Sequence, residues 1–64
     1  MPAKRIPIQV ELTEEEAWEL SQFLKRTRLD VYRSLSMTDS EAWLMMDAGN
    51  KIQKALEYAG YSPR

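Results

Sequence analysis

A chain of 64 residues with neither cysteine nor histidine has few ways to stabilise a fold other than packing. At this size only about 60% of the surface of the unfolded chain is buried on folding, which limits the chain to one small domain. Disulfides, thiolate zinc sites and histidine ligands are ruled out by composition, and we expect no metal and no cofactor. The chain therefore has to rely on its apolar core, on self-association or on a partner.

The composition indicates a folded protein rather than a disordered or membrane-spanning one. Hydrophobic residues make up 44% of the sequence, which is too many for a disordered segment. No apolar run approaches the length of about 18 residues that a membrane span needs. No apolar stretch of signal-peptide length follows Met1, so we expect a cytoplasmic protein.

Residues 5–12 show the alternation of an amphipathic β-strand. The apolar side chains on one face are Ile6, Ile8, Val10 and Leu12. Pro7 lacks the N–H that a ladder needs, which favours an edge position. No second alternating segment exists, so the strand needs its copy in another chain, irregular backbone of this chain or a target as a neighbour. Pairing between two copies is the interpretation we favour.

Two main helices follow, over residues 14–27 and 39–59. Thr13 and Glu16 have the spacing of a capping box, and the same pattern recurs at Thr38 and Glu41. The predicted core face of the first helix contains Ala17, Leu20, Phe23, Leu24 and Thr27. That of the second contains Ala42, Met45, Gly49, Ile52, Leu56 and Ala59, whose small members predict a close helix crossing or a contact between two chains.

A short helix or turn is predicted between them over residues 30–36, with Asp30 as its cap. The predicted fold class is therefore α+β, with one N-terminal strand, two main helices and a homodimer that completes the core.

Two tryptophans fall outside the predicted core faces. Trp18 shares a helical face with Gln22 and Lys25, and Trp43 shares one with Asn50. One interpretation is that both pack on the strand, on the 30–36 segment or across a homodimer. The other is a partner-binding patch, because tryptophan is enriched at interface hot spots. The candidate residues of this patch are Trp18, Trp43, Asn50, Glu14, Glu15, Glu19 and Asp47.

Catalysis is not expected from this sequence. Glu14, Glu15 and Glu16 lie at the positive end of a helix dipole, which explains their charge without a reaction. No phosphate loop, nucleophile elbow or calcium loop is present. The acidic segment could instead compete with nucleic acid for a basic groove on another protein.

A strand followed by two helices is also the layout of ribbon-helix-helix DNA-binding regulators, which is the alternative function. The candidate nucleic-acid contacts are Arg5, Gln9, Lys25, Arg26, Arg28 and Arg33. Against this alternative stand a net charge of −1 and the positions of Pro7 and Glu11 on the face that would meet DNA.

Several short segments carry a resemblance to a known group of proteins. They are Leu12–Ala17, Gln22–Arg26, Glu41-Ala42 with Met45 and Asp47-Ala48, Ala55-Leu56, and Ala59-Gly60-Tyr61 with Pro63-Arg64. With these the chain resembles a family of small uncharacterised proteobacterial proteins, often encoded near prophages and mobile elements. The resemblance implies no activity and no site residues. It implies a genetic context in which small, acidic inhibitors such as anti-CRISPR proteins occur.

We therefore expect a non-enzymatic protein-binding module of phage or mobile-element origin. Its partner would be a host or phage protein complex, which it would inhibit by occluding a surface.

Overall fold

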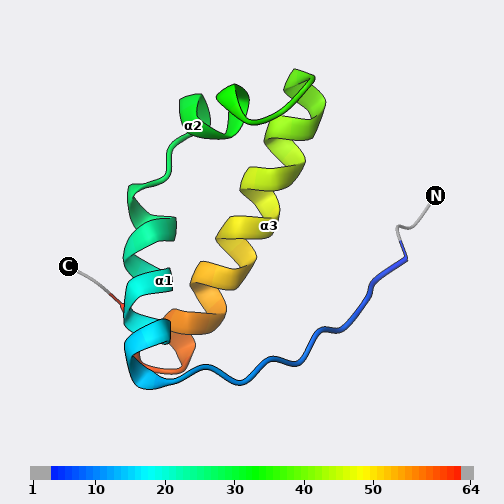
Figure 1. Ribbon diagram of the computed structural model, residues 1–64. Helices are drawn as coiled ribbons and strands as arrows, with labels where there is room; N and C mark the ends of the chain where they lie inside the picture. Colours follow the sequence, from blue (N-terminus) through cyan, green and yellow to red (C-terminus); the bar gives the residue numbers. More distant parts are fainter. Residues whose placement is uncertain (1–3, 63–64) are drawn as a thin grey trace.

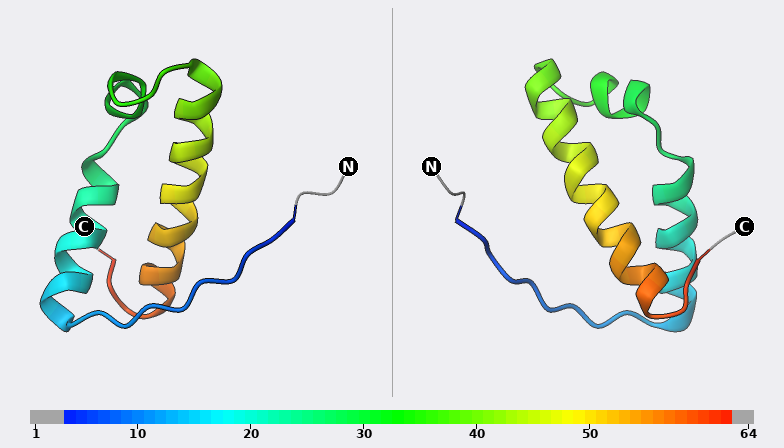
Figure 2. Two further views of the ribbon diagram at one scale, coloured as in Figure 1. Left: turned by 45° about the vertical axis from the view of Figure 1, so that its right-hand side comes forward. Right: turned by 180° about the vertical axis from the view of Figure 1, so that it is seen from behind.

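The computed structural model describes residues 4–62, and its helices form an open hairpin with an extended N-terminal segment (Figures 1 and 2). The helices are α1 (Glu14–Arg26), α2 (Leu29–Ser34) and α3 (Asp39–Tyr58). Helices α1 and α3 run antiparallel, and α2 bridges them at the end where α1 stops and α3 starts (Figure 1).

The predicted strand at residues 5–12 is wrong, and so is the α+β fold class. This segment is extended, but none of residues 4–62 belongs to a β-strand, so the fold is all-α. The physical reason is that a strand exists only beside another strand that completes its backbone hydrogen bonds. The alternation of apolar residues shows which side of the segment needs to be covered, but it does not provide a second strand.

Helix α1 begins with the predicted capping box. The Thr13 hydroxyl oxygen accepts a hydrogen bond from the Glu16 N–H at 3.1 Å, and a Glu16 carboxylate oxygen accepts one from the Thr13 N–H at 2.9 Å. The helix ends at Arg26, one residue before the predicted end, because Thr27 adopts an extended conformation and caps the helix.

Helix α3 begins after Thr38, whose hydroxyl oxygen accepts a hydrogen bond from the Glu41 N–H at 3.2 Å. The Glu41 carboxylate lies 3.5 Å from the Thr38 hydroxyl instead of returning to the backbone N–H, so only half of a capping box forms. The helix ends at Tyr58, one residue before the predicted end. Gly60 then turns the chain with a φ of 103°, a conformation that favours glycine.

Helix α2 spans Leu29–Ser34 instead of residues 30–36. The predicted cap is wrong, because Arg28 occupies the capping position without a side-chain hydrogen bond and Asp30 lies inside the first turn. The helix has no buried residue. It has no side-chain cap of its own, and its Tyr32 packs against Gly49 of α3.

The buried core is a narrow seam between α1 and α3. Its buried members are Ala17, Ser21, Leu24, Ala42, Gly49 and Leu56. Ser21 was not predicted in the core, and its hydroxyl is satisfied by donating to the Trp18 carbonyl oxygen at 2.7 Å. Gly49 confirms the predicted close approach, because an added Cβ there would collide with the Tyr32 hydroxyl and touch Leu24.

The predicted core faces were too wide. Phe23 is 59% exposed, Ile52 is 49% exposed, and Met45 and Ala59 are also exposed. Two helices in contact bury only the residues that point directly at each other, and a third element is needed to cover the flanking positions. In residues 4–62 nothing covers this flank completely.

Candidate protein-binding groove

The N-terminal segment, residues 4–12 and hereafter the arm, carries most of the apolar surface that the fold leaves uncovered. Ile6 is 74% exposed, Ile8 is 81% exposed and Val10 is 67% exposed. The arm leaves the start of α1 and diverges from α3 in all three views (Figures 1 and 2). Exposed β-branched side chains in such a row are rare on a monomer, because each leaves a large apolar area in water.

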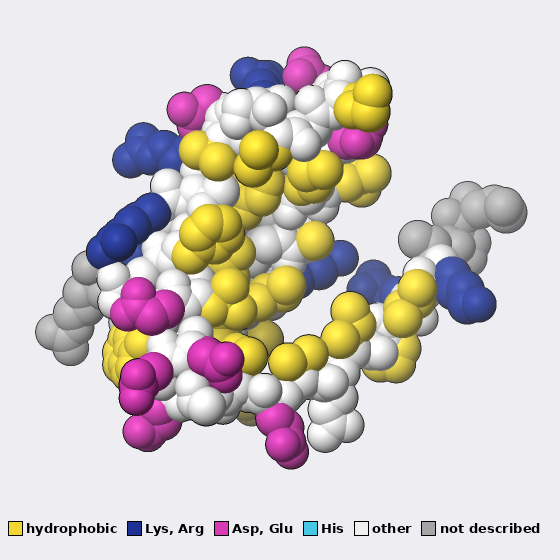
Figure 3. Space-filling model, in the orientation of Figure 1, with side chains coloured by type: hydrophobic (Ala, Val, Ile, Leu, Met, Phe, Trp, Pro, Cys, Tyr) yellow, Lys and Arg dark blue, Asp and Glu magenta, His cyan; other side chains and the backbone are white. Residues whose placement is uncertain are grey.

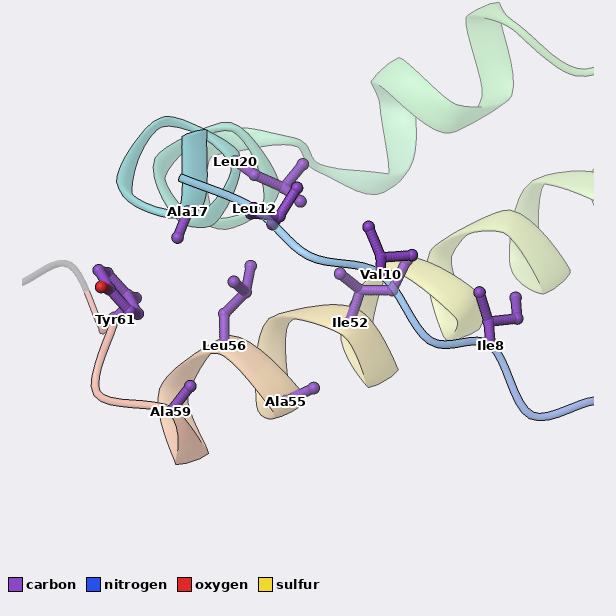
Figure 4. Close-up of a pocket in the computed structure, with 10 residues that line it drawn as sticks. All are labelled: Ile8, Val10, Leu12, Ala17, Leu20, Ile52, Ala55, Leu56, Ala59 and Tyr61. Atoms are coloured by element: carbon purple, nitrogen blue, oxygen red, sulfur yellow. The ribbon is translucent and has the colours of Figure 1, made fainter. Parts of the chain in front are cut away.

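An apolar groove of about 470 Å³ separates the arm from the helices (Figure 4). It is lined by Ile8, Val10 and Leu12 of the arm, Ala17 and Leu20 of α1, Ile52, Ala55, Leu56 and Ala59 of α3, and Tyr61. Three parts of the chain thus contribute apolar side chains to one hollow. Its chemistry is that of binding apolar groups, since the hydroxyl of Tyr61 is the one polar side-chain group in this lining.

The root of the arm is fixed by the start of α1. Leu12 precedes the capping residue Thr13 and lines the groove together with Ala17, four residues after Thr13. This is the arrangement of a hydrophobic staple, which sets the angle at which the chain enters a helix. The arm therefore starts in a defined direction beside the groove.

Apolar surface continues beyond the groove along the hairpin. Figure 3 shows apolar side chains running between the two long helices and along the arm. Exposed residues on these helices include Phe23 of α1 and Leu44 and Met45 of α3. The area available to a partner is therefore longer than the groove itself.

Charges are placed around the groove rather than inside it. An acidic group surrounds the start of α1, and Lys4 and Arg5 lie at the far end of the arm (Figure 3). The acidic group contains Glu11, Glu14, Glu15, Glu16 and Glu19, all exposed. Within residues 4–62 no three or more carboxylate, cysteine or histidine side chains are placed to hold a metal ion.

The structure does not bring the two predicted patch tryptophans together. Trp18 lies in the second turn of α1 and Trp43 in the second turn of α3, so they fall at opposite ends of the antiparallel pair (Figure 1). The rings of Trp18 and Tyr61 form a T-shaped pair, with centroids 5.3 Å apart.

The other predicted patch residues of α3 face away from the groove. At about 100° per residue, Asn50 and Trp43 lie 160–180° around the helix from Ile52, which lines the groove. Asp47 lies on the same side as Trp43. Glu14, Glu15 and Glu19 are nearer to the groove, at its acidic end.

The residues predicted for nucleic-acid binding fall into two groups. Arg5 and Gln9 lie on the arm, whereas Lys25, Arg26, Arg28 and Arg33 lie where α1 meets α2. Arg26 donates to the Gln22 amide oxygen at 2.7 Å, and Arg33 pairs with Asp39 at 3.5 Å. These contacts tie part of the second group to local partners.

Sequence reasoning assigned Leu20 and Ile52 to the core and did not predict the groove. The sequence signal for the groove is the width of the apolar faces of the two long helices, because these faces are wider than one contact between two helices can bury. The alternation of the arm pointed to the same missing cover.

The fold and the groove define a small all-helical domain with an uncovered apolar binding surface. Residues 1–64 match the model of a family of unknown function, DUF7706, and the chain belongs to this family. No curated protein and no solved structure matches the chain significantly. Within residues 4–62, no helix is both long enough and apolar enough to cross a bilayer.

Proposed function

We propose that the protein is a non-enzymatic protein-binding module that binds through the arm and the groove. The observation that carries this proposal is the row of exposed apolar arm side chains above a groove lined by apolar residues. An apolar patch rimmed by charged residues is typical of a surface that another protein covers.

A protein fits this surface better than a small molecule does. The groove is open along the arm, and exposed apolar residues extend from it to Phe23 and Met45. Small ligands are held in pockets that enclose most of their surface. An extended apolar row instead offers anchor positions for the side chains of a chain that lies along it.

The experiment that tests this proposal places a photo-cross-linking amino acid at position 8 of the arm and, in a matched variant, at position 58. Tyr58 is 96% exposed and outside the groove, so it reports random collisions. We expect cross-linked protein from position 8 only, and we expect Val10→Asp to abolish it. Equal cross-linking at both positions contradicts the proposal.

The alternative, a DNA-binding regulator, predicts different behaviour. It requires binding to a specific DNA sequence that weakens steeply with salt and is lost in the variant with Arg5→Ala and Gln9→Ala. We expect fluorescence anisotropy with labelled DNA to detect no such binding at low salt. Residues 4–62 of the single chain contain no strand, so the ribbon on which that function depends would have to form between the arms of two copies.

A target in a host or phage complex, a phage or mobile-element origin and an anti-CRISPR-like role stay predictions based on the sequence resemblance. A cytoplasmic location stays a prediction as well. The cross-linked partner, identified by mass spectrometry, tests the target directly.

A further inference from the structure

The chain exposes more surface than a folded monomer of its size. A globular protein of 7.5 kDa has an accessible surface of about 4,200 Å², whereas this chain has 5946 Å². Its radius of gyration is 12.9 Å, compared with about 10.7 Å for a globular domain of this length. The excess of about 1,700 Å² is surface that a compact fold of the same size would bury.

This excess matches what a permanent homodimer buries. If a second copy covered it on both chains, the complex would bury about 3,400 Å², within the range of about 2,000–5,000 Å² for permanent homodimers. Few residues are buried within the single chain, and such small domains commonly gain the missing core by association.

The charges at the two ends of the arm also fit a pairing of two copies of the chain. The far end of the arm is basic through Lys4 and Arg5, and neither forms an ion pair within residues 4–62. The root of the arm is acidic through Glu11 and Glu14. When two copies meet about a two-fold axis with their arms antiparallel, the basic end of each arm reaches the acidic root of the other. A foreign partner of one charge would complement only one end.

The arm does not close over its own groove. It diverges from α3 as it leaves the start of α1 (Figures 1 and 2), and Ile8 stays 81% exposed although it lines the groove. The capping box and Leu12 fix the direction of departure. The space between arm and helices is thus open to a second chain.

We infer that a second copy of this chain occupies the groove, with the arm of each chain lying across α1 and α3 of the other. This inference rests on the proposed function and names its partner. The two apolar arm faces and the two flanks that include Phe23 and Ile52 become the core of the dimer.

Sedimentation equilibrium of the full chain tests this inference. We expect a mass twice the 7.5 kDa of one chain. Val10→Asp is expected to raise the dissociation constant at least about tenfold, because a carboxylate would be buried without a partner. Gln9→Asp adds the same charge on the polar side of the arm, and we expect it to remain dimeric.

Arg5→Glu is the second variant; Arg5 is exposed and lies outside the helices, so we expect its replacement to leave the hairpin folded. We expect it to weaken the dimer at low salt, with a smaller difference at high salt. A monomeric wild-type chain overturns the inference, as does a dimer that neither Val10→Asp nor Arg5→Glu weakens.

The proposed function fails separately. In one outcome the wild-type chain is monomeric and still cross-links to a foreign protein from position 8, with the product lost in Val10→Asp. That result overturns the inference of a second copy in the groove and supports the proposed function. A monomeric chain without any product specific to position 8 overturns both.

Discussion

The helical hairpin and the arm both carry an amphipathic pattern, and only the hairpin satisfies it within one chain. Helices α1 and α3 form their backbone hydrogen bonds internally, so each needs only one covered face. The arm has the same need for a covered face, and it also needs partners for its backbone. Leu24 is 9% exposed and Ile8 is 81% exposed, which shows the difference directly.

The comparison teaches that local capping signals place the starts of the two long helices, whereas an extended segment depends on its neighbours. The first helix starts where Thr13 and Glu16 cap it with two hydrogen bonds between them. Residues 5–12 have an equally clear pattern, and they remain a single extended segment because no second one lies beside them.

The largest expected effect comes from removing a buried side chain of the helical hairpin. Leu24→Ala or Leu56→Ala removes a buried leucine from a small core and should lower the free energy of unfolding by about 2–4 kcal/mol. Urea unfolding followed by circular dichroism at one fixed protein concentration measures it. Tyr58→Ala is the control, since Tyr58 is 96% exposed. Equal effects of Leu24→Ala and Tyr58→Ala would contradict this core.

The second test removes a local start signal. Thr13→Ala removes the hydroxyl oxygen that accepts a hydrogen bond from the Glu16 N–H and should cost about 1 kcal/mol of stability, while the backbone N–H of residue 13 can still donate to the Glu16 carboxylate. Thr38→Ala removes the corresponding hydrogen bond from the Glu41 N–H, so we expect a similar cost by the same urea titration. A cost at one threonine without a similar cost at the other would contradict the equivalence of the two caps.

A third test concerns the close approach at Gly49. Alanine improves helix propensity by about 1 kcal/mol, but its Cβ would collide with the Tyr32 hydroxyl. We therefore expect Gly49→Ala to be nearly neutral alone and to gain about 1 kcal/mol in a Tyr32→Phe background. Additive effects of the two changes in thermal unfolding would show that the hydroxyl does not oppose the methyl group.

The smallest expected effect separates the two tryptophans. A double-mutant cycle of Trp18→Ala and Tyr61→Ala should give a coupling of about 0.5–1 kcal/mol from their edge contact. Trp43→Ala should change stability by less than about 0.5 kcal/mol, since its side chain is 48% exposed. If Trp18→Ala and Trp43→Ala both unfold the protein, both residues are structural and this prediction is wrong.

Much of the helical structure could be predicted from the sequence. The starts of α1 and α3 follow from Thr13 and Thr38, and the end of α3 follows from Gly60. The fold class could not, because strand formation depends on a neighbour that the pattern does not reveal. The start of α2 was also misplaced, since Arg28 caps it without any side-chain signal.

The candidate site was predicted less well than the helices. Apolar periodicity assigned Leu20, Phe23 and Ile52 to the core, and the structure places all three beside or along an uncovered surface. Periodicity reports which residues avoid water and does not distinguish a core from an interface. The size of the two tryptophans favoured a shared binding patch, but Trp18 and Trp43 lie near the starts of two antiparallel helices and so at opposite ends of the hairpin.

The complete capping box at Thr13 has a consequence for binding as well as for folding. Two hydrogen bonds and Leu12 hold the first turn of α1. The orientation of the arm is therefore set before a partner binds. A preorganised arm loses less conformational entropy on association than a freely swinging one. Thr13→Ala should therefore slow association as well as weaken α1, so one threonine would link the folding of a single chain to its rate of encounter.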